Sequence, residues 1–189
     1  AMVTDKLGDK TTVVFGARFE KTDIDYIGNI YDEDTDESVD DLEEVSGDSS
    51  YSNILPSLNI QHEFSDKFIA NLAYSNSIAR PNYYDLVPYQ VLVSEDLEIE
   101  VGNPDLEASL SNNIDLMLDY YFGCTALVSG GVFFKSIDNW LYEFADNNYE
   151  YNGVSGWDYR QLRNGSKAEV TGLESVSYTH LTLPTNQCV

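Results

Sequence analysis

Long polar connections alternate with very short ones along this chain, between runs of residues that have strand character. Residues 64–66 alone separate the second run from the third, and residues 123–125 alone separate the fourth from the fifth. The long connections span residues 25–50, 78–110 and 145–166. Short turns at one end and long loops at the other are typical of an outer-membrane β-barrel, whose short turns face the periplasm. The predicted strands are 11–24, 51–63, 67–77, 111–122, 126–144 and a sixth that starts near Lys167.

The runs alternate between apolar and polar residues, as half-buried strands do. A soluble β-sandwich alternates in the same way, with its apolar faces turned inward. Run length favours the barrel, because runs of 11 to 19 residues exceed ordinary globular strands and suit strands of about 9–11 residues that cross a bilayer and project beyond it. We therefore expect an all-β fold, a partial transmembrane antiparallel β-barrel. Its convex outer face should carry Phe15, Leu72, Leu116, Leu118 and Val132, and its concave face Arg18, Asn71 and Asp115.

The net charge is −23, from 33 acidic and 10 basic residues. Twelve of the acidic residues fall between Asp23 and Asp48, and no Lys or Arg occurs between Lys21 and Lys67. Such a run repels itself and stays solvated, which indicates an exposed loop. Binding of divalent cations by this run stays open. The charge argues against a nucleic-acid partner, because phosphate contacts need a cationic surface.

Other protein classes find little support in the sequence. No uncharged apolar stretch approaches the roughly 18 residues of a transmembrane helix, and residues 1–10 contain no apolar signal segment, so we expect the true N-terminus to lie upstream. Cys124 and Cys188 suggest no disulfide framework. With His62 and His180 as its only histidines, the chain shows no catalytic, cofactor-binding or metal-binding motif, and we expect no enzyme and no cofactor.

Several motifs, in order and spacing, resemble the C-terminal barrel region of TonB-dependent outer-membrane receptors. They include Arg80-Pro81, the sequence Asp85-Leu86-Val87-Pro88, and Gly102-Asn103-Pro104. Further motifs are Ser111-Asn112-Asn113, Tyr120-Tyr121-Phe122, Gly131-Val132-Phe133-Phe134, Asn164-Gly165 and Gly172-Leu173-Glu174.

The resemblance implies a 22-stranded barrel closed by a plug, of which this fragment supplies about six strands with short periplasmic turns and long extracellular loops. It implies the outer membrane of a Gram-negative bacterium, where the barrel contacts lipid. The whole protein would take up a scarce solute, driven by the TonB energy-transducing complex acting through the plug. Plug, TonB box and the family's closing strand are not in this sequence.

The motifs also have local interpretations. Pro81 fixes its own φ and ends the third strand, and Arg80 is expected to pair with a lumen or loop carboxylate. Gly102, Asn103 and Pro104 are turn residues that return the long loop to the fourth strand. Trp140, Tyr142 and Phe144 fit the aromatic girdle of a barrel.

The substrate prediction rests on the last long loop. Tyr149, Tyr151, Trp157 and Tyr159 offer flat faces on which a sugar could stack, and strongly acidic loops would repel anionic ferric chelates. The sequences of the Arg-Pro and Gly-Asn-Pro motifs and these aromatic residues favour uptake of an oligosaccharide. A ferric siderophore or cobalamin is the second choice of substrate. Packing of the loop by these aromatics is the simpler explanation. A soluble secreted acidic β-domain that binds carbohydrate or calcium is the alternative from a different class.

The last residues depart from the family pattern. Residues 1–174 form the barrel fragment, whereas 175–189 resemble translated sequencing-adapter read-through and are interpreted as a non-native tail.

Overall fold

The computed structural model describes residues 1–32, 44–122 and 126–179, which form eleven strands in one continuous sheet and one 3-10 helix. The helix is η2 (Tyr84–Leu86). The strands are β1 (Met2–Lys6), β2 (Thr11–Asp32), β3 (Glu44–Ser65), β4 (Phe68–Ala79), β5 (Gln90–Val93), β6 (Glu98–Val101), β7 (Ser109–Phe122), β8 (Ala126–Asp138), β9 (Leu141–Tyr151), β10 (Val154–Asn164) and β11 (Lys167–Tyr178).

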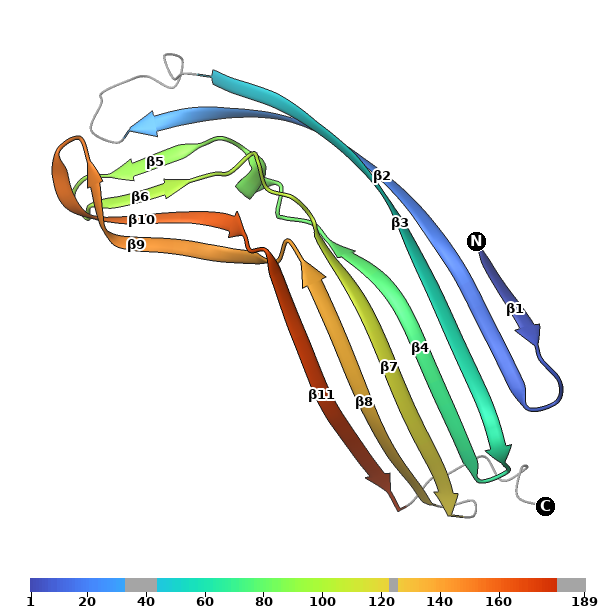
Figure 1. The fold of residues 1–189 in the computed structure, drawn as a ribbon. Coiled ribbons are helices and arrows are strands. Elements are labelled where there is room, and N and C mark those ends of the chain that lie inside the picture. Colours follow the sequence, from blue (N-terminus) through green and yellow to red (C-terminus); the bar gives the residue numbers. More distant parts are fainter. Residues whose placement is uncertain (33–43, 123–125, 180–189) are drawn as a thin grey trace.

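Seven of these strands form the wall, a curved antiparallel sheet in the order β1-β2-β3-β4-β7-β8-β11 (Figure 1). The predicted meander of neighbouring strands is confirmed, with β1 as an additional strand at its edge. Only Asp66 and Lys67 separate β3 from β4, so one short turn is even tighter than predicted. The other predicted turn, 123–125, lies outside the described residues. The wall is a partial barrel and does not close on itself.

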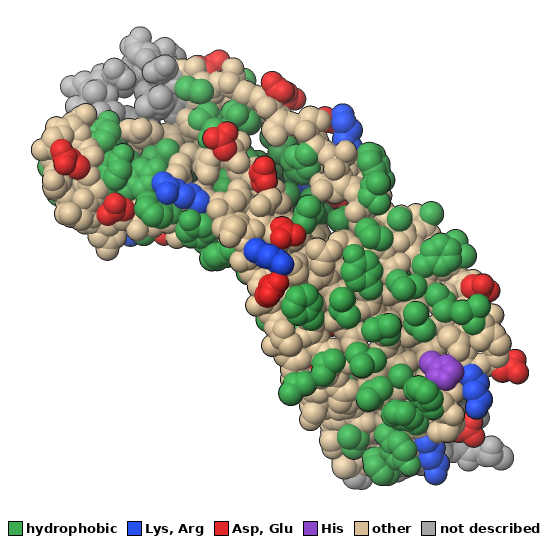
Figure 2. Space-filling view, viewed as in Figure 1, with side chains coloured by type: hydrophobic (Ala, Val, Ile, Leu, Met, Phe, Trp, Pro, Cys, Tyr) green, Lys and Arg blue, Asp and Glu red, His purple; other side chains and the backbone are tan. Residues whose placement is uncertain are grey.

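Register divides the predicted apolar and polar side chains between two opposite faces of the wall. Leu72 pairs with Leu116, and Leu116 pairs with Val132 across neighbouring strands. Because side chains alternate along a strand, Asn71 and Asp115 lie on the opposite face. Figure 2 shows hydrophobic side chains gathered over the wall strands. The same register groups Phe15 and Leu118 with Leu72 and places Arg18 on the opposite face.

The apolar face of the wall has no protein partner among the described residues. Leu72 is 41% exposed, Leu116 39% and Val132 46%. A soluble sandwich would bury these side chains against a second sheet. A wall that exposes this many contiguous apolar residues needs an apolar environment outside it, which a bilayer supplies. The geometry therefore disfavours the soluble β-domain considered as an alternative.

The upper ends of the wall differ from the prediction. Residues 25–50 were expected to form a loop, but β2 continues to Asp32 and β3 begins at Glu44. Backbone pairing between β2 and β3 continues as far as Asn29 and Glu44. The two strands therefore extend through residues whose side chains are largely polar. Most of the acidic run, residues 33–43, lies outside the described residues.

The other two predicted loops are also largely strand. β5 and β6 occupy part of 78–110, and β9 and β10 occupy most of 145–166. Together they form the rim sheet, in the order β5-β6-β10-β9, which folds over beside the upper ends of β2 and β3 (Figure 1). The run 126–144, predicted as one strand, breaks after Asp138 because Asn139 adopts a left-handed conformation with φ 55°. At this break the chain leaves the wall, and the following hairpin, β9–β10, joins the rim sheet: β8 lies between β7 and β11, whereas β10 lies between β6 and β9.

The rim sheet contains the hydrophobic core of the described chain. Leu92, Ile99 and Trp157 are buried against one another, with Tyr151 and Tyr159 packed beside them. The described residues include no helix that is long and apolar enough to cross a membrane. At the C-terminal end, Ser175–Tyr178 continue β11 opposite Leu127–Gly130, and residues 180–189 are not described. Assignment of 175–189 as a non-native tail stays a prediction.

Candidate functional site

The apolar face ends in aromatic residues at its short-turn end. Phe64 and Phe68 stack with ring centroids 5.2 Å apart, and Tyr120 contacts Phe122 edge-on at 4.7 Å. Aliphatic side chains such as Leu116 follow further up the strands. This order, with aromatics at the boundary and aliphatics within, is that of an outer-membrane barrel wall.

The residues predicted for an upper girdle lie at or beyond the break between β8 and β9. Trp140 and Tyr142 lie near the break between β8 and β9, with ring centroids 5.1 Å apart. Phe144 instead belongs to the rim sheet, where the Arg163 guanidinium covers its ring at 3.8 Å. Tyr142 belongs to the same strand, β9, where it pairs with Arg163. Of the three predicted girdle residues only Trp140 lies outside the rim sheet, so a girdle formed by all three is not realised.

Polar side chains on the opposite face bond to one another across strands. Asn71 of β4 donates a hydrogen bond of 3.0 Å to the Asp119 carboxylate of β7. Ser129 of β8, which is buried, donates to the other oxygen of the same carboxylate. Such bonds let a face of polar side chains stay ordered in contact with water, which suits the lumen of a barrel.

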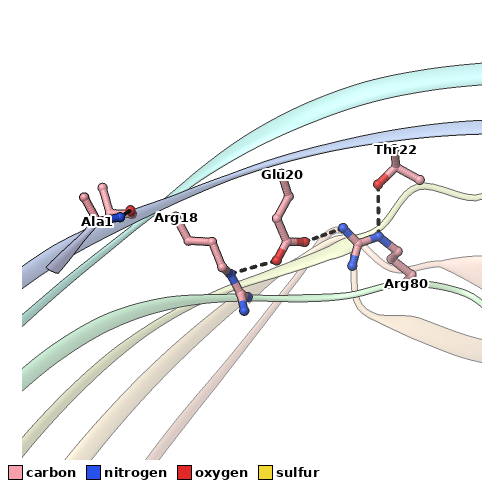
Figure 3. Close-up of polar contacts among 6 residues, drawn as sticks. Ala1, Arg18, Glu20, Thr22 and Arg80 are labelled. Atoms are coloured by element: carbon pink, nitrogen blue, oxygen red, sulfur yellow. Dashed lines mark hydrogen bonds and ion pairs between the residues drawn. The ribbon is translucent and has the colours of Figure 1, made fainter.

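Arg80 lies at the end of β4 and reaches across β3 to two side chains of β2. Its guanidinium pairs with the Glu20 carboxylate, and its Nε donates to Thr22 Oγ1 at 3.1 Å (Figure 3). Arg18 Nε contacts the other Glu20 oxygen at 2.7 Å. The predicted pairing of Arg80 with a carboxylate is confirmed. Pro81 is buried two residues beyond Ala79, the last residue of β4, as expected of a strand-ending proline.

The motif Gly102-Asn103-Pro104 fastens the long loop to the rim sheet. A Cβ at Gly102 would lie 1.8 Å from the Val87 carbonyl oxygen, so no side chain fits there. Asn103 donates to the Leu162 carbonyl at 3.0 Å through its amide nitrogen. Pro104 begins a turn at residues 104–105, and β7 begins at Ser109.

A second fastening point was not assigned from the sequence. The Asn164 side chain donates to the carbonyl oxygens of Glu107 and Asn139 at 2.9 and 2.8 Å, and its own oxygen accepts from the Glu107 amide. Ser109 also donates to the Asn139 carbonyl, at 2.8 Å. These bonds hold the point where the hairpin leaves the wall. The Asn-Gly pair at Asn164 was the only sequence signal of a special backbone position there.

The four candidate substrate aromatics form two pairs. Tyr149 and Tyr159 lie with ring centroids 4.7 Å apart, and Tyr149 is 37% exposed. Tyr151 contacts Trp157 edge-on at 5.5 Å. Trp157 is only 6% exposed and belongs to the rim core. Of the four, only Tyr149 is exposed, and contact with a solute stays a prediction for all of them.

A polar pocket of about 210 Å³ lies between η2, β6, β9 and β10, lined in part by Asp85, Tyr89, Glu100 and Arg160. The Tyr89 hydroxyl donates to Glu100 at 2.7 Å. Burial, together with this hydrogen bond, strongly raises the pKa of Tyr89, so the phenol stays neutral. Burial and the nearby Glu100 charge also raise the pKa of Asp85. The pocket thus combines the neutral Tyr89 hydroxyl and the acidic side chains of Asp85 and Glu100 with the guanidinium of Arg160.

The sequence matches the outer membrane protein beta-barrel family over residues 1–186. A search of curated proteins gives no match. Three solved structures are similar. The hemophore receptor HasR of Serratia marcescens, in complex with its hemophore and heme, is 14% identical with a TM-score of 0.68. The siderophore receptor PirA from Acinetobacter baumannii is 19% identical with a TM-score of 0.59. The FrpB iron transporter from Neisseria meningitidis is 13% identical with a TM-score of 0.55.

These alignments cover 93%, 93% and 95% of this chain, but only 30%, 24% and 22% of the respective receptors. At such identities the likeness shows the fold, and the chain spans less than a third of each receptor. The resemblance to receptor barrels inferred from the sequence motifs is confirmed. The chain belongs to the outer membrane protein beta-barrel family and forms part of a barrel wall in the outer membrane.

Proposed function

We propose that this chain forms part of the wall and extracellular rim of an outer-membrane transporter that takes up a scarce solute. The observation that carries the proposal is the joining of two unlike parts in one sheet. The wall is apolar on one face and polar on the other, whereas the rim sheet has its own core and a polar pocket at the long-loop end. A wall alone would serve any barrel; a folded rim provides a surface that can select a solute.

Energy would come from the TonB complex, acting through a plug domain elsewhere in the protein. The role is transport, and no catalytic step is proposed. Deleting TonB in cells that carry the complete receptor should abolish solute accumulation while leaving solute binding at the cell surface. Accumulation that persists without TonB would refute active uptake.

The first candidate solute is an iron chelate or haem. The three similar structures are a hemophore receptor bound to heme, a siderophore receptor and an iron transporter. Burial of Trp157 in the rim core also removes part of the support for a sugar-stacking platform.

An oligosaccharide is kept as the second candidate because Tyr149 is exposed and its ring lies against that of Tyr159. In addition, the carboxylates of Asp85, Glu100 and Glu143 around the pocket would repel a strongly anionic chelate.

Titration calorimetry on the complete receptor separates the candidates. Ferric enterobactin, haem and a neutral maltose oligomer are each titrated into the wild type and into Tyr149→Ala. If the oligosaccharide is the solute, Tyr149→Ala should weaken its binding by about 1–2 kcal/mol, the scale of one lost aromatic contact. If an iron compound is the solute, it should bind and the oligosaccharide should give no heat. Val154→Ala, an exposed position on the neighbouring strand, is the matched control.

A further inference from the structure

Gly130 lies on the apolar face of β8, opposite Leu118, and its lack of a side chain has no explanation within the described chain. Its φ is not positive. Pairing with Leu118 on one side and Ser175 on the other continues without a bulge. A Cβ built at Gly130 would meet nothing within 4 Å. A glycine inside a strand weakens it, and where no bend or bulge requires the glycine, it often marks the close approach of another molecule.

The adjacent glycine shows the contrast. Gly131 lies on the polar face, where a Cβ would come within 2.9 Å of the Met117 sulfur, so a neighbouring side chain occupies the vacant space. At Gly130 no side chain does so. The space there is empty within the described structure.

The empty space continues as a groove of about 350 Å³ along the apolar face. Leu116, Leu118, Val132 and Leu173 line it together with Gly130 and the backbone of Gly131, and these surfaces are almost wholly apolar. Glu174 borders it at the edge strand, although register assigns Glu174 to the polar face with Gly131. The volume is at the lower end of the range of ligand pockets.

We propose that this groove, the Gly130 groove, binds one acyl chain of a phospholipid from the periplasmic leaflet. The groove is continuous with the face that already contacts membrane lipid, and its lining offers an occupant no hydrogen-bonding side chain except at the Glu174 border. An acyl chain is thin, flexible and apolar, and so it suits a shallow groove whose depth is that of the side chain that Gly130 lacks.

The position of Gly130 along the strand identifies the leaflet. Gly130 lies four residues beyond Ala126, where β8 begins at the short-turn end. At about 3.4 Å per residue this is about 14 Å along the strand, or roughly 10 Å in height for a strand tilted by about 40°. The apolar band of such a barrel is about 25 Å tall, so Gly130 falls in its periplasmic half. The proposal depends on membrane placement and is independent of the solute.

Native mass spectrometry of the complete receptor in mild detergent tests the proposal. Palmitoyl-oleoyl phosphatidylethanolamine and lipopolysaccharide are added in separate samples, and retained lipid is counted. Gly130→Leu should fill the groove and lower phosphatidylethanolamine occupancy at least about five-fold, which corresponds to ~1 kcal/mol. Gly130→Ala should give an intermediate loss. Val128→Leu, on the same strand and face but outside the groove lining, should retain lipid as the wild type does.

Folding of each variant is checked by its heat-modifiable mobility on gels, and Gly130→Ala serves if Gly130→Leu does not fold. Equal lipid retention in the wild type and the glycine variants would overturn the proposal, as would an equal loss in Val128→Leu. Loss of lipopolysaccharide in place of phosphatidylethanolamine would overturn the leaflet. A receptor dimer that dissociates in Gly130→Leu would show that a second copy, and not a lipid, occupies the groove.

Discussion

Leu116→Arg tests the direction in which the wall faces. Leu116 lies at the middle of the apolar band, paired with Leu72 and Val132, and is 39% exposed to what surrounds the wall. A guanidinium at this depth would have to leave water for hydrocarbon. For a strand residue near the midplane this costs about 2–4 kcal/mol, less if the long side chain reaches toward an interface.

The assay is urea-induced unfolding of the complete barrel refolded into phosphocholine vesicles. The matched control is Asp115→Arg, which introduces the same side chain at the next residue, on the opposite face. Since the control side chain meets the polar face, its effect should stay within about 0.5 kcal/mol, as for most surface changes. Equal destabilisation by the two variants, or none by Leu116→Arg, would refute the assignment of the faces.

Three further predictions concern the rim. Gly102→Ala places a Cβ 1.8 Å from the Val87 carbonyl oxygen and should destabilise the rim sheet by about 1–3 kcal/mol. Gly130→Ala, which has free space around its Cβ, should not destabilise it. Hydrogen exchange of β5 and β6 measures the loss of stability, and wild-type protection in Gly102→Ala would contradict the prediction. Trp157→Ala removes a core side chain and should lower the stability of the rim sheet by about 3–5 kcal/mol, while the wall strands keep their protection from hydrogen exchange. Loss of protection in the rim and the wall together would show that the two parts unfold as one unit. Because burial and Glu100 raise the folded-state pKa of Asp85 above its unfolded value, the stability that its protonated form contributes at low pH is lost as pH rises through the raised pKa. Asp85→Asn should therefore increase exchange protection of β5 and β6 at pH 8 more than at pH 4, and an equal effect at both would contradict the prediction.

The wall was predictable from the sequence because its strands and their faces are determined by residues close together in the chain. Period-two alternation decides which residues share a face, and the short turn at Asp66 and Lys67 brings β3 and β4 together in one register. Leu72, Leu116 and Val132 therefore appear where alternation predicts them.

The rim sheet was not predictable in the same way. β5 and β6 have only four residues each, too few for periodicity to distinguish them from loop. Their neighbours are distant in sequence: β5 pairs in parallel with the end of β2, and β6 with β10. Trp157 lies in the rim core because the chain leaves the wall at Asn139 and the β9–β10 pairing shifts register on both sides of Trp157, and neither feature follows from periodicity.

The outward direction of the apolar face is the central claim, and spin labelling tests it directly. Single cysteines replace Leu72 and Ala73, adjacent residues on opposite faces of β4, in a complete receptor whose Cys124 is changed to Ser. Each is labelled with a nitroxide in liposomes, and its collision rates with oxygen and with a water-soluble nickel chelate are compared. Oxygen concentrates in lipid, so the label at Leu72 should show the lower ratio of nickel to oxygen collisions. An equal or reversed ratio at the two positions would contradict the claim that this chain is a membrane barrel wall.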